Sequence, residues 1–280
     1  MGRVVVVTDS SANVPAHLVQ QLDIRVVPIL LALNGRTFRD GLDVTAKQVY
    51  QWLRTNKHLP TTSAPSIGDF LRVYASAAQE ASNIVSIHLS PKLSATYKVA
   101  KAASQLVDNA TIRVINSHTV AMGQGFVAVA AARAAAGGAG LEEVVARAEQ
   151  VASKMNLLAT LDTLEYLHRG GRIGGGAAVL GALLQIKPVL YVTDGHVDLF
   201  ARPRTKSKAI RIMMEQLTSA ADGGSLHVAI FHADVPQEAE ALQNRIATDL
   251  ECDELYVTEM TPMMGAHTGP GVLGVVFYAE

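Results

Sequence analysis

The chain has 280 residues, of which 49% are hydrophobic, and its 24 basic side chains nearly balance 25 acidic ones. That length and hydrophobic content suffice for one large domain or two compact ones, and the balanced charge argues against a broad cationic surface for nucleic acid. The single cysteine, Cys252, excludes a disulfide framework within the chain and fits a reducing compartment.

The sequence contains no obvious export or membrane-spanning segment. Arg3 is followed by only four valines, which is too short for the apolar core of a secretory signal. The most apolar long window, residues 125–141, consists largely of alanine and glycine and has Arg133 in its middle. We therefore expect a cytoplasmic protein with no integral membrane association and no nucleic-acid partner.

The first half of the chain alternates short β-branched runs with stretches of helical periodicity. Residues 4–7, 84–89 and 112–115 are predicted strands. A capping box formed by Ser66 and Asp69 predicts the start of a helix, and a second predicted helix covers residues 141–155. This alternation is typical of a mostly parallel, Rossmann-like sheet with flanking helices.

The pattern changes near Met155. Residues 157–161 look like a strand, and residues 189–192 and 197–201 flank Asp194-Gly195, a strong hairpin signal. Two further helical faces follow, each ahead of another strand-like run. The second half is therefore predicted to be a mixed sheet with helices, and the fold class is α/β with two domains, residues 1–155 and 156–280.

Polar residues follow the predicted strands of the first half, at the end of the sheet where ligands of parallel α/β folds bind. Thr8-Asp9-Ser10-Ser11 follows the first strand, and Ser94 lies near a helix N-terminus after the second. Ser94 either caps that helix or holds a ligand carboxylate with its hydroxyl group. Thr62 and Ser63, just upstream of the capped helix, make a shared anion site plausible on the same edge.

Five residues near the chain's end, His267-Thr268-Gly269-Pro270-Gly271, are predicted to form one tight turn before a strand at residues 272–279. Glycine permits positive φ and close approach of a ligand, and histidine can donate a hydrogen bond to an anion. Taken alone, the segment is an ordinary Gly-Pro-Gly turn with an exposed histidine. Only partner segments elsewhere in the chain turn it into a headgroup site.

Residues 164–176 include five glycines within seven residues and two arginines, which indicates either a flexible hinge or a phosphate-facing loop. Neither nucleotide-binding fingerprint fits this stretch. The chain also has no nucleophile elbow, no zinc-protease helix and no paired-cysteine spacing, so we expect no metal and no cofactor. A triad of Ser94, His267 and Asp9 keeps a serine hydrolase open as an alternative, and the Arg-Gly stretch keeps a kinase or nucleotide-binding component open.

In their order along the chain, these segments resemble the DegV family of bacterial fatty-acid-binding proteins over nearly the whole length. Two departures from the family pattern are Ala95, where glycine is usual, and Asn116, where aspartate is common. The segments that carry the resemblance are Thr8-Asp9-Ser10-Ser11, Asp40-Gly41, Thr62-Ser63-Ala64-Pro65-Ser66, Leu93-Ser94-Ala95-Thr96-Tyr97, residues 164–173, Ile186-Lys187-Pro188-Val189-Leu190, residues 202–206 and His267-Thr268-Gly269-Pro270-Gly271.

The resemblance implies a non-enzymatic carrier that buries a long-chain fatty acid in a lipid pocket between its two domains and presents it to a fatty-acid kinase. Motif position implies that the carboxylate is held by Thr62, Ser94, His267 and Thr268, with Ser63 and Ala95 as secondary contacts. Arg169, Arg172 and Arg202 would meet the partner or a phosphate. Apolar residues expected to line the tunnel are Met122, Phe126, Val179, Leu180, Leu183, Met263 and Met264, with residues 177–184 as a gate.

Overall fold

The structure is a computed structural model, and it describes residues 2–173 and 186–280. Its contacts divide the chain into two compact units, the first comprising Met1–Asp43 and Thr62–Ser153 and the second comprising Val44–Thr61 and Lys154–Glu280. No sequence pattern indicated that residues 44–61 join the second unit by contact. As a division into folding domains, the boundary after residue 155 stays a prediction. The expected gate at residues 177–184, with Val179, Leu180 and Leu183, lies outside the described residues.

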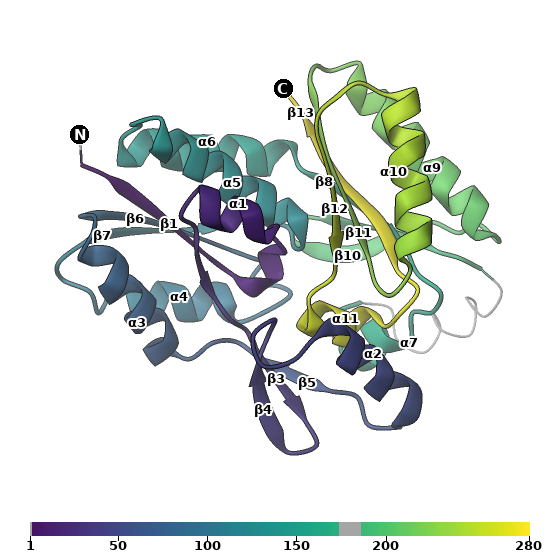
Figure 1. The fold of residues 1–280 in the computed structure, drawn as a ribbon, viewed down its shortest axis with the longest axis horizontal. Coiled ribbons are helices and arrows are strands. Elements are labelled where there is room, and N and C mark those ends of the chain that lie inside the picture. Colours follow the sequence, from purple (N-terminus) through teal and green to yellow (C-terminus); the bar gives the residue numbers. More distant parts are fainter. Residues whose placement is uncertain (1, 174–185) are drawn as a thin grey trace. The chain divides into compact units, whose positions relative to one another are not determined.

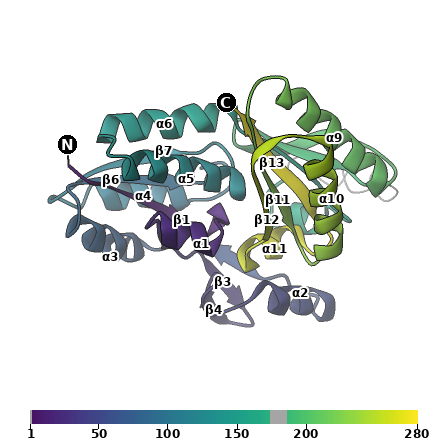
Figure 2. The same cartoon turned by 45° about the horizontal axis from the view of Figure 1, so that its top comes forward.

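The first unit contains the predicted parallel sheet. Its strand order is β2-β1-β6-β7, and every neighbouring pair runs parallel. Helices α3 and α4 cover one side of this sheet and α5 covers the other (Figures 1 and 2). Burial on both faces explains why all six residues of β1 are buried. The bounds are β1 Val4–Asp9, β2 Arg25–Val27, β6 Asn83–His88, β7 Thr111–Asn116, α3 Ile67–Ala78, α4 Thr96–Ser104 and α5 Met122–Ala136.

The capping box predicted for α3 is confirmed, because the Asp69 amide donates to Ser66 Oγ and the Asp69 carboxylate accepts from the Ser66 amide. A small three-stranded sheet in the order β4-β3-β5 was not predicted. It places Thr62 in a strand just ahead of α3. The remaining elements of this half are η1 Ser10–Ala12, α1 Ala16–Gln21, β3 Leu30–Leu33, β4 Arg36–Arg39, β5 Thr61–Ser63 and α6 Leu141–Lys154.

The second unit contains the predicted mixed sheet, with six strands in the order β10-β9-β8-β13-β11-β12. Strands β11 and β12 run parallel, and the other neighbours run antiparallel. Asp194 and Gly195 both have positive φ, 47° and 76°, which confirms the predicted hairpin turn. The bounds are β8 Asn156–Thr160, β9 Val189–Thr193, β10 His196–Ala201, β11 Leu226–His232, β12 Cys252–Glu259 and β13 Leu273–Ala279.

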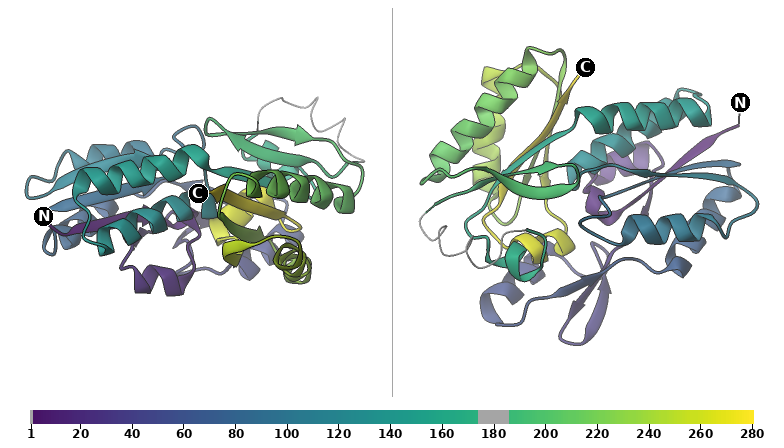
Figure 3. Two further views of the ribbon diagram at one scale, coloured as in Figure 1. Left: turned by 90° about the horizontal axis from the view of Figure 1, so that it is seen from above. Right: turned by 180° about the vertical axis from the view of Figure 1, so that it is seen from behind.

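Helices α9 (Lys206–Ala221) and α10 (Pro236–Asp249) lie together on one face of the mixed sheet (Figure 3). They share a buried core with alternate residues of the strands, such as Val228, Ile230 and Val275. This alternation is the period-2 pattern of a strand with one face on a helical layer. None of the helices in the described ranges has both the length and the apolar character that crossing a bilayer requires.

Helix α2 (Ala46–Thr55) packs against α11 (Pro262–Thr268) within the second unit. A capping box between Thr45 and Gln48 starts α2, and Tyr50 is fully buried. The Tyr50 ring lies directly over Gly265, where an added Cβ atom would come within 2.6 Å of Tyr50 Cε1. Glycine is therefore required at position 265 for the two helices to approach each other this closely.

Substitution of Gly265 by alanine tests this contact. We expect Gly265→Ala to lower the free energy of unfolding by about 1–3 kcal/mol, because the new methyl group overlaps the Tyr50 ring. Urea unfolding followed by circular dichroism measures the change. Gly68→Ala on α3 is the control, since its added methyl group would be 3.7 Å or more from its neighbours. Equal losses of unfolding free energy in both variants would show that the contact with Tyr50 does not cause the destabilisation.

Candidate functional site

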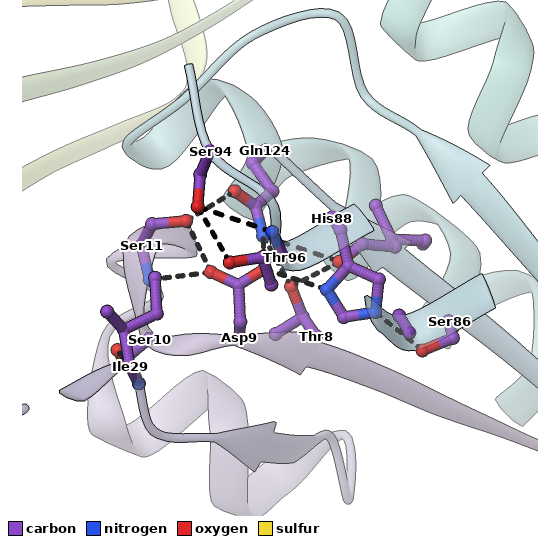
Figure 4. A network of polar contacts seen from close by, with 12 residues as sticks. Thr8, Asp9, Ser10, Ser11, Ile29, Ser86, His88, Ser94, Thr96 and Gln124 are labelled. Carbon is purple, nitrogen blue, oxygen red and sulfur yellow. Dashed lines mark hydrogen bonds and ion pairs between the residues drawn. The ribbon is translucent and has the colours of Figure 1, made fainter. Parts of the chain in front are cut away.

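A buried carboxylate lies at the carboxyl end of β1. Asp9, the last residue of that strand, is fully buried and accepts hydrogen bonds from the backbone amide of Ser11 at 3.0 Å and from Gln124 Nε2 at 3.0 Å. His88 Nδ1 lies 2.7 Å from the second carboxylate oxygen and donates to it, since an ionised carboxylate only accepts. The Ser11 hydroxyl group also bonds to Asp9 (Figure 4). These donors compensate the burial of the carboxylate.

The hydrogen bonds continue from His88 into the sheet. His88 Nε2 lies 2.7 Å from Ser86 Oγ, and Ser86 accepts from the Tyr74 hydroxyl group at 2.9 Å. Ser86, His88 and Asp9 thus have the distances of a serine-protease triad. All three side chains are 0% exposed, and Ser86 lies inside β6, so no substrate reaches them. We interpret this arrangement as structural.

Ser94 lies between β6 and α4, close to the Asp9 network (Figure 4). Its Oγ atom accepts the Thr96 amide at 3.3 Å and lies 2.9 Å from Thr96 Oγ1. Ala95, rather than Ser94, occupies the N-cap position of α4. Because the Asp9 carboxylate is already bound by Ser11, Gln124 and His88, it is not available as the acid of a Ser94 triad.

The other predicted residues of the first unit lie nearer the surface. Thr62 is half-buried in β5, whereas Ser63 and Ala95 are exposed. In the second unit, Met263 and Met264 are buried on α11, and in the first, Met122 and Phe126 are buried on α5. Their burial fits both a tunnel lining and an ordinary core, so their role as tunnel residues stays a prediction.

The prediction that residues 267–271 form one tight turn is wrong at its start. His267 and Thr268 are the last two residues of helix α11, which begins with Pro262 in its first turn. The Gly269 amide bonds back to the Gly265 carbonyl at 2.8 Å, and its φ of 72° then turns the chain out of the helix. The helix therefore fixes the backbone that carries His267, which a loop would not do.

Side chains from the segment that includes α7 (Glu165–Arg169) pack tightly around the glycines of this region. A Cβ atom on Gly269 would lie 2.1 Å from Tyr166 Cδ2, and one on Gly271 would lie 2.1 Å from a carboxylate oxygen of Asp162. A Cβ atom on Gly170 would lie 2.9 Å from His267 Nδ1. Three glycines thus allow the segment around α7 and the end of α11 to meet, which holds the imidazole in place.

His267 is held in its neutral form. Burial, with a smaller contribution from the positive charge of Arg172, lowers the pKa of His267 from its ordinary 6.5 to about 4. At neutral pH the ring therefore carries one N–H donor and no charge. Thr268 Oγ1 donates to the Met264 carbonyl at 3.0 Å, so its hydroxyl proton is already used within α11.

The three predicted arginines differ in their contacts. Arg169 donates to Glu165 and to the Lys57 carbonyl, each at 2.9 Å, and so ties α7 to the loop after α2. Arg172 donates to the Gly170 carbonyl. Arg202 is exposed and makes no hydrogen bond or ion pair with any other residue in the described ranges. Contact of these arginines with a partner or a phosphate stays a prediction.

The network around Asp9 was not predicted from the sequence. The sequence nevertheless contains a signal for it, namely polar residues within apolar runs. His88 lies between Ile87 and Leu89, and Gln124 lies in a helix whose other residues are mostly apolar and buried. Such residues require buried partners. Within the described ranges, no group of three or more histidine, cysteine or acidic side chains is arranged to hold a metal ion.

The neutral state of His267 makes stability depend on pH. As pH falls from about 6.5 towards 4, the unfolded chain binds a proton at this position and the folded protein does not, so stability is lost at up to about 1.4 kcal/mol per pH unit. Below pH 4 both states are protonated and this loss stops. Urea unfolding at pH 7.5, 6, 5 and 4.5 measures it. A His267→Gln variant should show a shallower pH dependence, and identical slopes would contradict the assignment.

Comparison with known proteins agrees with this architecture. The family model of the DegV family matches residues 3–280. A DegV domain-containing protein of Streptomyces coelicolor is 36% identical over 275 residues, covering 98% of this chain and 97% of the relative. The protein DegV of Bacillus subtilis is 31% identical over 274 residues, covering 97% and 98%.

Two solved structures are similar over the same extent. One, described as fatty acid binding of a DegV family protein from Thermus thermophilus, has a TM-score of 0.94 and 34% identity, covering 99% of this chain and 100% of that one. Another, DegV described as a fatty acid binding protein from Bacillus subtilis, has a TM-score of 0.90 and 29% identity, with both chains fully covered. The expected resemblance is therefore confirmed, and the chain belongs to the DegV family.

Proposed function

We propose that this protein binds a long-chain fatty acid and acts as its carrier rather than as an enzyme. The observation that carries the proposal is the full-length similarity to the Thermus thermophilus protein, which is described as binding fatty acid. The neutral and largely buried state of His267 supports it, because a histidine in that state can donate to a carboxylate.

The acyl chain supplies most of the affinity in this proposal. Burying about 16 methylene groups at roughly 0.8 kcal/mol each gives on the order of 12 kcal/mol of transfer free energy before ordering costs. The headgroup then needs only enough hydrogen bonds to compensate the desolvation of the carboxylate. Hydroxyl groups and a neutral imidazole can supply these without burying an arginine beside the ligand.

We propose Thr62, Ser94, His267 and Thr268 as the carboxylate ligands, with Ser63 and Ala95 as secondary contacts. That all four hold one carboxylate is the part of the proposal that derives from the family resemblance. Their donors are not equally available. Ser94 has one hydroxyl neighbour, whereas the Thr268 proton already bonds to the Met264 carbonyl and must leave it to reach a ligand. We expect Thr268 to contribute least.

Native mass spectrometry of the purified protein tests this function. We expect the wild type to retain an acyl chain with the mass of a fatty acid, and a variant carrying both Ser94→Ala and His267→Ala to lose most of it. Removal of two hydrogen bonds to a charged group predicts a loss of affinity of roughly a hundredfold or more. Thr268→Val should retain more ligand than Ser94→Ala.

The matched control is Ser104→Ala at the exposed end of α4, whose hydroxyl group bonds only to its own helix. This variant should keep the ligand. Full retention of fatty acid by the double variant would reject the headgroup assignment, and an empty wild-type protein would reject the function. Esterase activity that disappears in Ser94→Ala would instead establish the hydrolase alternative, which lacks Asp9 as its acid.

We further propose that the bound fatty acid is presented to a fatty-acid kinase and that Arg202 contacts that kinase or the new phosphate. Among the three candidate arginines, Arg202 is the one whose guanidinium group makes no hydrogen bond or ion pair with other described residues. Arginine binds phosphate and carboxylate oxygens with two parallel hydrogen bonds. Arg169 and Arg172 are held by contacts within their own unit, so their contribution is expected to be smaller.

Phosphorylation of the bound fatty acid by an added bacterial fatty-acid kinase tests this role. Arg202→Ala should leave fatty-acid retention unchanged and lower the rate of acyl phosphate formation by about tenfold, as expected for loss of one charged contact. Arg211→Ala is the control, since Arg211 is exposed on α9 and pairs with Glu215. Equal rates for Arg202→Ala and the wild type would reject the contact.

A further inference from the structure

Thr96 is a buried polar residue at the start of α4. Its side chain is 0% exposed, and within the described ranges its hydroxyl group forms a hydrogen bond with Ser94 Oγ at 2.9 Å. The Thr96 backbone amide also donates to Ser94 Oγ at 3.3 Å. Thr96 thus contacts the Ser94 oxygen twice, once from the main chain and once from the side chain (Figure 4).

The two hydroxyl groups share one hydrogen bond, and either can be its donor. If Ser94 donates, its proton points to Thr96 and is not available to a ligand. If Thr96 donates, Ser94 Oγ accepts both Thr96 protons and its own proton points away from Thr96. A bound carboxylate accepts but does not donate, so it selects the second arrangement. Donation from Thr96 also polarises Ser94 and strengthens its bond to the ligand.

Asp9 is a nearby acceptor that could compete for a hydroxyl proton of Ser94 or Thr96 (Figure 4). Its carboxylate already receives the Ser11 amide, Gln124 Nε2 and His88 Nδ1. Gln124 in turn bonds to Thr8 Oγ1 at 3.0 Å, which holds its amide group in this orientation. The carboxylate beside the Ser94 loop is therefore satisfied by its own partners and does not compete for the hydroxyl protons of Ser94 and Thr96.

We propose that Thr96 is a positioning residue for fatty-acid binding, which orients the Ser94 hydroxyl proton towards the ligand carboxylate by donating to Ser94 Oγ. The inference rests on the proposed function and adds to it a residue that does not touch the ligand. Its effect depends on the negative charge of the ligand, because hydrogen bonds to a carboxylate are stronger than hydrogen bonds to a neutral oxygen.

The test compares binding of hexadecanoic acid with binding of its methyl ester, which has the same chain and no charge. In Thr96→Val, which keeps the shape and the backbone amide but lacks the hydroxyl group, we expect the Kd for the acid to rise about fivefold to tenfold and the Kd for the ester to change less than twofold. Thr96→Ser restores the hydroxyl group and should bind both ligands like the wild type. Thr96→Ala is a second hydroxyl-free variant in case valine disturbs the start of α4.

The outcomes separate this inference from the function on which it rests. If the hydroxyl-free variants bind the acid as tightly as the wild type, Thr96 does not position Ser94. If they lose acid and ester equally, Thr96 contributes packing only, and the inference is overturned. If the wild type binds neither ligand, the proposed function itself fails. Selective loss of the acid, restored in Thr96→Ser, supports the inference.

Discussion

A buried carboxylate must be surrounded by hydrogen-bond donors, and this constraint organises the first unit. Asp9 receives hydrogen bonds from Ser11, His88 and Gln124, which come from three separate parts of the chain. Loss of any one would leave a buried charge under-satisfied at a cost of several kcal/mol. The carboxyl ends of β1 and β6 and the start of α5 are therefore fixed relative to one another, and the Ser94 loop begins where they meet.

Close backbone packing plays the corresponding role in the second unit. Gly265 accommodates the Tyr50 ring, Gly269 the Tyr166 ring, and Gly170 the His267 imidazole. Each contact removes the space that a side chain would need, so α11 is held by α2 and by the segment around α7. The same packing buries the His267 imidazole from solvent and keeps it neutral at physiological pH. His267 therefore lies on a helix that is packed on two sides, whereas Ser94 lies in the loop between β6 and α4.

Much of the local structure could be predicted from the sequence. The Ser66 capping box and the Asp194-Gly195 hairpin depend on neighbouring residues, and both formed as expected. The predictions failed where contacts with distant segments of the chain determine the local structure. Gly269 and Pro270 predict a turn at the end of α11, because both residues favour turns. In the structure, packing against α2 and α7 stabilises a helix up to Thr268. The small three-stranded sheet that makes Thr62 part of a strand was not predicted, because it depends on pairing between segments that are apart in the sequence.

By itself, the sequence determined the α/β class and the order of most strands and helices, because periodicity, caps and turn chemistry act over a few residues. Only the tertiary structure decided which polar groups already form hydrogen bonds within the protein. Asp9 and His88 are 79 positions apart, and no local pattern reveals that they bond to each other. A hydroxyl proton that bonds to one acceptor cannot bond to a ligand, wherever that acceptor lies in the chain. Whether the protons of Ser94, Thr96 and Thr268 are available to a ligand therefore follows from three-dimensional contacts alone.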